Sequence, residues 1–489
     1  MGEVKKQTLS GVKWSAIERF SIQGVTFLLG LVVARLLTPA DYGLVGMVGI
    51  FFGVSQTLID SGFGNALVRK NDRTEDDFYT AFYFCLVVSI VCAGLICLGS
   101  PWIADFFNQP LLSPISKVLS LNLILGTLGM IPSCKMYIAL DFKTTAKINF
   151  ICAVVSGLLG LALAFMGYGV WALVWQSIGS NVLRVILLWG YRPCKLLLRF
   201  SKKSFNQLFG YGSKIAASGL LHTIYSEMTT IVIGKFYTPA SLGNYSRGVG
   251  MSSLPVNIIT GIVGKVTFPI LARIQDDDER LIKIYRSYIS LIMMGVVFGC
   301  MLMAALAKPL ILGLLTAKWS GAIIFVQIFA FAIVFDPICS LNLNLLQVKG
   351  RSDLFLRLEI IKKTIAVIIL FAAIPFGVVA ICISKVVYTQ VAVALNTYYT
   401  GKLFGLGYWQ QWKDFSPYFG YSLIACLPSI ALAYLCPWHF VSLIAGSVSA
   451  VIIYIWILKI RQDTVFMTHV APTLQTFIQK LPPQCRFSI

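Results

Sequence analysis

Charged residues are scarce in this sequence. Asp, Glu, Lys and Arg together make up 12% of the 489 residues, whereas 57% are hydrophobic. A soluble protein of this length normally carries about twice that charged fraction. The composition therefore excludes a soluble enzyme, an intrinsically disordered chain and a secreted disulfide scaffold.

Acidic residues are the scarcer charged class, with 20 Asp and Glu against 40 Lys and Arg. The net charge of +20 would also suit a protein that binds nucleic acid. No long polar segment is present to carry such a basic face, however, and basic residues also collect in the cytoplasmic loops of membrane proteins. We therefore expect no nucleic-acid partner.

Sequence motifs for metal, redox or ATP chemistry are missing as well. The chain has 3 His, and its 12 Cys include no C-x-x-C pair. There is no G-x-x-x-x-G-K-[ST] loop. These features predict no metal and no cofactor. A cleavable signal peptide is not expected either, because Glu18 and Arg19 interrupt the first apolar stretch and no small-residue cleavage site follows.

Long uncharged runs are what the sequence does have. A helix needs about 20 apolar residues to cross the hydrocarbon core of a bilayer. The runs predict an all-α polytopic membrane protein, and they cover residues 78–104, 148–183, 287–307, 364–384 and 415–458.

The hydropathy of the whole chain predicts 14 transmembrane helices. They lie near residues 12–36, 42–67, 78–100, 114–138, 147–166, 170–190, 208–236, 243–270, 286–306, 320–346, 358–375, 378–400, 415–434 and 440–458.

Basic residues alternate between the predicted loops. The odd-numbered turns are nearly free of Lys and Arg. By the positive-inside rule, this places both termini in the cytoplasm. The even-numbered turns carry Arg69, Lys70, Arg73, Lys143, Lys147, Arg273, Arg280, Lys283, Lys349, Arg351 and Arg357.

The connection at residues 191–206 is the longest between predicted spans. Arg192, Lys195, Arg199 and Lys202 follow one another at steps of three, four and three. This spacing suits an amphipathic helix on the anionic inner leaflet, and a solvated basic loop is the alternative because Pro193 delays any helix. We assign no function to the predicted cytoplasmic tail at residues 459–489.

A short repeat relates two parts of the chain. Arg35-Leu-Leu-Thr-Pro-Ala-Asp-Tyr-Gly43 matches Lys235-Phe-Tyr-Thr-Pro-Ala-Ser-Leu-Gly243 at an offset of 200. Parallel repeats in transporters hold a shared site between them. The repeat predicts two lobes of six helices, residues 1–190 and 207–400, with two extra C-terminal helices at 401–458.

Several motifs resemble those of a known family. The chain resembles the Wzx-like polysaccharide exporters of the multidrug/oligosaccharidyl-lipid/polysaccharide flippase superfamily, closest to the colanic-acid and teichuronic-acid type, over residues 1–460. The motifs are Ala34-Arg-Leu-Leu-Thr-Pro-Ala-Asp-Tyr-Gly43, Asp60-Ser-Gly-Phe-Gly-Asn-Ala-Leu67, Gly243-Asn-Tyr-Ser-Arg247, Phe268-Pro269 with Ile274-Gln-Asp276, and Lys349-Gly-Arg-Ser-Asp353.

This resemblance implies a fold, a cargo and partners. The two lobes would surround a central cavity and flip an undecaprenyl-diphosphate-linked oligosaccharide from the inner to the outer leaflet of the bacterial cytoplasmic membrane, for O-antigen, capsule or exopolysaccharide assembly. Membrane lipids and the polysaccharide polymerase and export machinery would be partners of a working monomer. The same fold serves lipid II flippases and cation-coupled multidrug exporters, which stay as alternatives.

Basic residues inside spans are candidates for binding the diphosphate, since such residues are costly there. Arg19 shares a polar face with Gln23, although a Glu18–Arg19 pair that holds helices together would also explain it. Arg247 and Lys265 are 18 residues apart, which is five helical turns on one face. Snorkelling to the interfaces is the alternative for both.

Lys214 completes the candidate cations of the cavity. The candidate groups for binding a coupling H⁺ or Na⁺, or for gating, are Asp60, Glu18, Glu227 and Asp336. These carboxylates could equally pair with Arg19 or Lys214. Asp336 precedes Pro337, so either a broken helix lining the cavity or a capped kink is expected there.

The charges of span eight and of the outer loops weigh against other functions. Span eight offers two cations and no carboxylate, which favours an anionic cargo over a cationic drug. An enzyme acting on sugars at the outer face would need carboxylates or histidines in sizeable outer loops. The two longest of these loops are residues 100–113 and 307–319. Asp105 is the only carboxylate in them, and they contain no histidine. We therefore expect a transporter and not an enzyme.

Overall fold

The computed structural model describes residues 22–60, 62–70, 72–139, 141–191, 199–274, 276–349 and 351–472. Within these ranges the chain forms helices and no strand, which confirms the all-α fold. After a first helix at residues 22–36, the elements are α2 (Pro39–Asp60), α3 (Phe63–Arg69), α4 (Glu75–Phe107), α5 (Leu112–Leu128), α6 (Met130–Ile138), α7 (Phe142–Phe165), α8 (Val170–Tyr191), α9 (Lys202–Phe236), α10 (Pro239–Arg273), α11 (Asp278–Ala305), α12 (Ala307–Pro309), η1 (Leu310–Leu315), η2 (Ala317–Trp319), α13 (Ala322–Ile333), α14 (Asp336–Val348), α15 (Ser352–Ala373), η3 (Ile374–Phe376), α16 (Val378–Phe404), α17 (Tyr408–Leu435), α18 (His439–Ile460) and η4 (Phe466–Val470).

Many of these helices are long and apolar enough to cross a membrane. Among the described residues, nine spans meet that test, with α13 and α14 together forming one of them. A tenth is added if α5 and α6, which meet at a bend of 40°, make one span. These spans confirm a multi-pass membrane protein.

The four remaining predicted spans also coincide with helical residues. They correspond to the helix at 22–36 and to α9, α10 and α15. The first of these is short within the described part, and the other three mix polar or charged residues with apolar ones. The total of 14 spans therefore stays a prediction.

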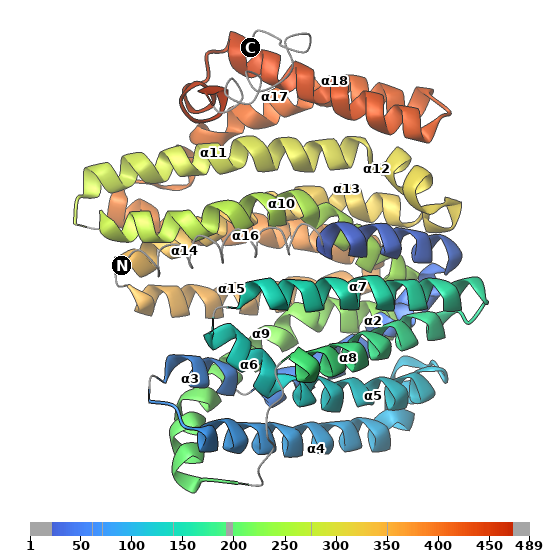
Figure 1. Cartoon of the computed structure of the whole chain (residues 1–489). Helices are drawn as coiled ribbons and strands as arrows, with labels where there is room; N and C mark the ends of the chain where they lie inside the picture. The colour runs from blue at the N-terminus through green and yellow to red at the C-terminus, as the bar shows by residue number, and fades with distance from the viewer. Residues whose placement is uncertain are drawn as a thin grey trace. The chain divides into compact units, whose positions relative to one another are not determined.

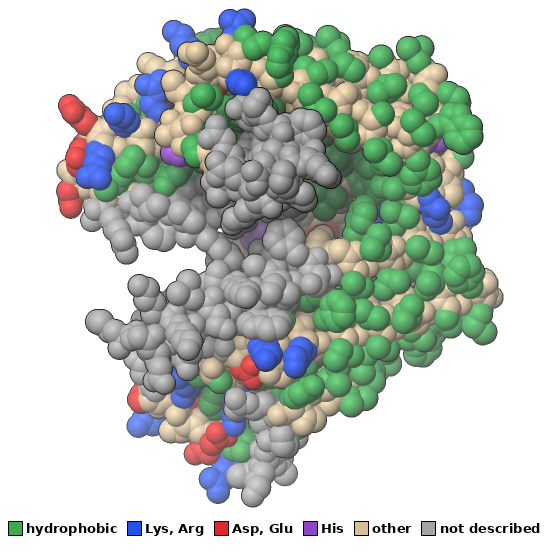
Figure 2. Space-filling view, turned by 45° about the horizontal axis from the view of Figure 1, so that its top comes forward, with side chains coloured by type: hydrophobic (Ala, Val, Ile, Leu, Met, Phe, Trp, Pro, Cys, Tyr) green, Lys and Arg blue, Asp and Glu red, His purple; other side chains and the backbone are tan. Residues whose placement is uncertain are grey.

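Apolar side chains cover much of the face shown in Figure 2, and charged side chains gather toward its ends. The exposed apolar residues include large ones such as Leu98 and Trp102 on α4 and Ile444 and Ile452 on α18. In water such a surface would be unfavourable, whereas lipid tails solvate it at no cost. The surface therefore fits a chain embedded in a bilayer.

Side chains fix where several helices begin. The Asp141 carboxylate accepts a hydrogen bond from the Thr144 backbone N–H at the start of α7, at 3.2 Å. Ser201 does the same for Ser204 at the start of α9, at 3.3 Å. Each of these N-caps satisfies a backbone donor that the first helical turn would otherwise leave unpaired.

The chain divides into two compact units, Met1–Gly243 (unit 1) and Asn244–Ile489 (unit 2). In unit 1, α4 packs on α5, α7 packs on α8, and α2 packs on α9 (Figure 1). Thus α9, which the repeat assigns to the second lobe, contributes to the compact unit that contains α2 and α4. The lobe boundaries at 190 and 207 stay a prediction. The repeat defines lobes by internal symmetry, whereas the compact units are defined by contacts between residues, so the two divisions need not coincide.

The core of unit 2 forms around α11. Tyr285, Ile289, Met293 and Val297 recur every four residues on this helix, and all are completely buried. This spacing puts them on one face of the helix, which packs against α13 and α17. Unit 2 therefore has a helix–helix core of the ordinary amphipathic kind.

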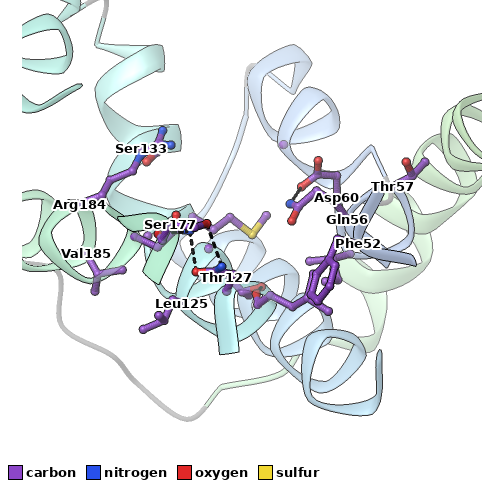
Figure 3. A pocket seen from close by; sticks show the side chains of 18 of the residues that line it. Phe52, Gln56, Thr57, Asp60, Leu125, Thr127, Ser133, Ser177, Arg184 and Val185 are labelled. Atoms are coloured by element: carbon purple, nitrogen blue, oxygen red, sulfur yellow. Dashed lines mark hydrogen bonds between the residues drawn. The ribbon is translucent and has the colours of Figure 1, made fainter. Parts of the chain in front are cut away.

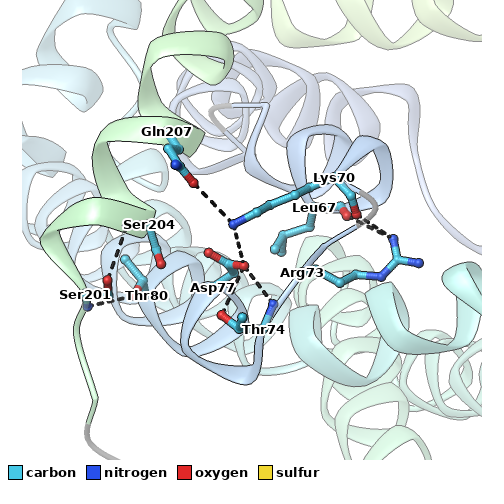
Figure 4. Close-up of polar contacts among 9 residues, drawn as sticks. All are labelled: Leu67, Lys70, Arg73, Thr74, Asp77, Thr80, Ser201, Ser204 and Gln207. Atoms are coloured by element: carbon cyan, nitrogen blue, oxygen red, sulfur yellow. Dashed lines mark hydrogen bonds and ion pairs between the residues drawn. The ribbon is translucent and has the colours of Figure 1, made fainter.

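An ion pair links the end of α3 to the first turn of α4, and a further hydrogen bond links it to α9 (Figure 4). The Lys70 ammonium donates to the Asp77 carboxylate at 2.8 Å and to the Gln207 side-chain oxygen at 3.2 Å. Asp77 is completely buried, and its carboxylate also accepts from the Thr74 backbone N–H at 2.8 Å. The polar turn before α4 is thus fixed to α9 within unit 1.

The two repeat motifs contact each other in unit 1. A Cβ atom added at Gly43 would lie 1.8 Å from the carbonyl oxygen of Pro239. A Cβ added at Gly243 would lie 1.8 Å from the carbonyl oxygen of Pro39. The contact is reciprocal, and only glycine permits so close an approach at either position.

Candidate functional site

Unit 1 contains a cavity of about 1100 Å³ (the unit 1 cavity). Its walls come from α2, α3, α5, α6, α7, α8 and α9 (Figure 3). The space beside three lining glycines is open, since a Cβ at Gly49, Gly64 or Gly126 would meet no atom within 4 Å.

An amide cluster forms one wall. Asn181 on α8 donates from Nδ2 to Asn122 Oδ1 on α5 at 2.9 Å, and Asn122 donates from Nδ2 to Ser177 Oγ at 3.0 Å. Ser177 and Asn181 are one turn apart on α8, and α5 packs against that helix. The three side chains thus hold one another in fixed orientations.

Arg184 lies on the same face of α8, three residues beyond Asn181. Its side chain is exposed, lines the cavity and extends toward Ser133 of α6 (Figure 3). Within the part of the chain that the structure describes, the guanidinium makes no ion pair or hydrogen bond. A cation inside a membrane span calls for a compensating anion or water.

The opposite wall carries the carboxylate. Gln56 on α2 donates from Nε2 to Asp60 Oδ1 at 3.0 Å. Beside them, the Thr57 hydroxyl lies 3.1 Å from the Thr223 hydroxyl of α9. Figure 3 shows Gln56 and Asp60 across the cavity from Arg184. Among the lining side chains that the structure describes, Arg184 and Asp60 are the charged ones, so their formal charges cancel.

Of the binding and coupling residues predicted from the sequence, only some lie in the wall of this cavity. Asp60 lies in the wall of the unit 1 cavity, and Glu227 is half-buried on α9 without lining it. Gln23 is exposed on the helix at 22–36 and also does not line it. Glu18 and Arg19 lie outside the described residues, as do the side chains of Lys214 and Lys265.

Two further candidates lie in unit 2. The Arg247 guanidinium stacks over the buried Trp319 ring, 5.6 Å from its centroid. Asp336 begins α14 with an exposed side chain, after α13 ends at Ile333. The helix is thus interrupted for two residues just before Asp336-Pro337, within a single span, and both the broken helix and the capped kink stay predictions. The roles assigned to these residues stay predictions.

Lys235 and Lys308 lie near the odd-numbered turns, which the charge pattern places outside the cytoplasm, and both contact other parts of the chain. The Lys235 ammonium donates to the Phe106 carbonyl near the end of α4 and lies 4.5 Å from the centroid of that ring. Lys308 lies 4.9 Å from the Tyr434 ring centroid. These contacts give both lysines a structural reason to be there, through helix capping and cation–π attraction.

Sequence reasoning missed Asn122, Ser177, Asn181 and Arg184. A signal was available, since Arg184 interrupts a predicted span just as Arg19 does. Moreover, Ser177, Asn181 and Arg184 follow one another at steps of four and three. What the sequence does not contain is the pairing of α5 with α8, which alone turns those residues into one wall.

Comparison with known proteins gives a family match and several relatives. The family model described as "Polysaccharide biosynthesis protein" matches residues 32–324. The chain is 26% identical over 374 residues to the lipopolysaccharide biosynthesis protein WzxC of Escherichia coli, covering 73% of each chain. It is 25% identical to the teichuronic acid biosynthesis protein TuaB of Bacillus subtilis, covering 72% of this chain and 74% of the relative.

A third relative is the succinoglycan biosynthesis transport protein ExoT of Rhizobium meliloti, at 22% identity over 65% of this chain and 64% of the relative. Among solved structures, the lipid II flippase MurJ in an inward closed conformation has a TM-score of 0.75. That match covers 93% of this chain and 100% of the other, at 13% identity. Such a likeness shows a shared fold.

Proposed function

The chain belongs to the polysaccharide biosynthesis protein family, whose model matches more than half of it, and we propose that it is a flippase for a lipid-linked oligosaccharide. It moves this cargo from the inner to the outer leaflet of the bacterial cytoplasmic membrane for the assembly of a cell-surface polysaccharide. We infer undecaprenyl diphosphate as the lipid carrier. The names of WzxC, TuaB and ExoT support a place in cell-surface polysaccharide synthesis.

The unit 1 cavity is the observation that carries this proposal. Its volume of about 1100 Å³ lies just above the ~300–1,000 Å³ range of small-molecule sites. Its walls offer amides and hydroxyls, while the exterior of the chain is apolar. A polar headgroup can therefore enter a polar space as its lipid tail stays in hydrocarbon.

The chemistry of this transfer breaks no covalent bond. Moving sugar hydroxyls through hydrocarbon is costly, because each loses its hydrogen bonds to water. Cavity groups such as Asn122, Ser177 and Asn181 replace those bonds and so lower the barrier. Alternating access through rocking of the two repeats is the motion we propose, with both termini in the cytoplasm.

The cavity lining favours a saccharide over the cargo of a multidrug exporter. A cationic drug would call for an excess of carboxylates, whereas Asp60 is balanced here by Arg184. Uncharged amide and hydroxyl groups outnumber both. Such groups match the hydroxyl-rich surface of sugars, because each hydroxyl both donates and accepts hydrogen bonds.

Deletion of the gene tests the proposal directly. We expect the deletion strain to lose its surface polysaccharide and to accumulate a lipid-linked oligosaccharide in the cytoplasmic leaflet, and the intact gene to reverse both effects. Mass spectrometry of extracted lipids and labelling of surface glycans measure the two readouts. Normal surface polysaccharide in the deletion strain would contradict the proposal.

A further inference from the structure

The wall formed by α5 and α8 has unused capacity for hydrogen bonding. In the described part of the chain, Asn181 Oδ1 accepts no hydrogen bond, and the Ser177 hydroxyl donates none. The mutual bonds of the cluster fix the orientation of these groups in the cavity wall. A preorganised set of donors and acceptors binds a polar ligand without paying to order its own side chains.

Arg184 adds a charge to the same wall. Seven residues separate it from Ser177, which places it about 10 Å further along α8. A ligand that reaches both would have neutral polar groups at one end and an anionic group at the other. A guanidinium binds a carboxylate or a phosphate with two parallel hydrogen bonds, so either anion could in principle be its partner.

The charge balance of the cavity distinguishes between these anions. Arg184 and Asp60 sum to zero among the described lining side chains. A diphosphate carries about two negative charges and would meet one cation and one repelling carboxylate. A single carboxylate adds one negative charge, about half that of the diphosphate, and next to Arg184 it lies on the wall opposite Asp60 (Figure 3).

We propose that the α5–α8 wall is a saccharide-binding subsite that selects an oligosaccharide bearing an acidic sugar. Arg184 binds the sugar carboxylate, and Asn122, Ser177 and Asn181 bind neighbouring hydroxyls. The diphosphate of the carrier binds outside this wall. This inference rests on the proposed flippase function, because it names the cargo of the same cavity.

The test uses the full-length protein in liposomes and four synthetic lipids. The lipids carry either cellobiose or cellobiouronic acid, which differ by one carboxylate, and each sugar is attached through either a diphosphate or a monophosphate. The rate of flipping is measured as the appearance of sugar at the outer leaflet. Arg184→Gln removes the charge, and Arg351→Gln is the control, because Arg351 pairs with Asp353 in unit 2.

We expect the wild type to flip the acidic lipid about tenfold faster than the neutral lipid, with either phosphate linkage, as a charge-assisted hydrogen bond provides. Arg184→Gln should remove this preference by slowing the acidic lipid alone. Arg351→Gln should keep it. The ratio of two rates within one variant is insensitive to a loss of folded protein, so a structural role for Arg184 would not reproduce this pattern.

Other outcomes overturn the inference separately from the function. If Arg184→Gln removes a preference for diphosphate over monophosphate and leaves the carboxylate preference intact, Arg184 binds the diphosphate of the carrier and not the sugar. If the variant behaves like the wild type, the wall is not an acidic-sugar subsite, although the flippase function stands. A wild type that flips none of the four lipids would count against the function itself.

Discussion

Two buried asparagines of unit 2 show how much a single amide depends on its partners. Asn342 exchanges hydrogen bonds with Gln411 at 2.9 Å in both directions and accepts one from Thr400 at 2.8 Å. Asn396 is equally buried, yet among the described residues its amide has no partner except the Cys339 thiol, which forms only weak hydrogen bonds. A satisfied buried amide stabilises the fold, and an unsatisfied one costs its desolvation.

We therefore predict opposite effects for one substitution at these two positions. Asn342→Leu should lower the free energy of unfolding by about 2–3 kcal/mol, because Gln411 and Thr400 lose their partner. Asn396→Leu should leave stability unchanged or raise it. Thermal unfolding of the purified protein in detergent measures both. Equal losses for the two variants would show that Asn396 has a partner, such as an ordered water.

At the scale of helices, the starts of α2 and α10 are held together by the reciprocal contact of Gly43 with Pro239 and of Gly243 with Pro39. We predict that Gly43→Ala destabilises the protein, since the added methyl group would overlap a backbone carbonyl that cannot rotate away. Overpacking of this kind typically costs about 1–3 kcal/mol.

The matched control for that substitution is Gly94→Ala in the middle of α4. A Cβ there would meet no atom within 4 Å, so only the helix propensity changes. This control should gain about 0.5–1 kcal/mol, as alanine does over glycine inside helices. Detergent melting curves of the two variants compare the signs. A stabilised Gly43→Ala protein would mean that the two helix starts separate readily.

The junction of α4 with α9 depends on a buried charge. Asp77 is completely buried beside Lys70, whereas the Arg351–Asp353 pair at the start of α15 is exposed. We predict that Asp77→Ala costs up to about 3 kcal/mol, because the half-buried Lys70 ammonium loses its counter-ion and keeps only Gln207 and partial contact with water. Asp353→Ala should leave the free energy of unfolding nearly unchanged, because water screens this exposed pair. Chemical denaturation of both variants tests the difference.

The sequence predicted the helices more completely than it predicted the residues of the cavity. Continuous apolar runs mark α4, α7, α11, α17 and α18 without any knowledge of tertiary structure, whereas the run at 364–384 covers the connection between α15 and α16. The repeat also located Pro39 and Pro239, although nothing in the sequence indicates that each contacts the glycine of the other motif. Asp60 was found because a carboxylate in a span is unusual, but Asn122 and Asn181 are ordinary residues until α5 meets α8. Which helix faces meet is a property of packing, and hydropathy does not encode it.

At the scale of the whole molecule, the cargo crosses the membrane potential as an anion. A lipid diphosphate carries about two negative charges, and the cell interior is electrically negative. Moving one charge through the full potential is worth about 2.3 kcal/mol per 100 mV, so two charges give about 4.6 kcal/mol. That is enough to bias the cycle outward without ATP, provided that the cations that bind the cargo do not move with it.

We predict that the protein in liposomes flips a lipid-diphosphate saccharide faster when the loading side is negative, even with no ion gradient. A potassium diffusion potential set by valinomycin supplies the voltage, and a neutral lipid-linked sugar is the control that should not respond. If the rate ignores the potential yet follows a Na⁺ or H⁺ gradient, the drive is ion exchange. The Asp60 carboxylate, which faces the unit 1 cavity beside Gln56, is then the first group to test, with Asp60→Asn. Loss of the gradient dependence in that variant would locate the coupling site in the cavity itself, whereas its persistence would direct attention to Glu227 or Asp336.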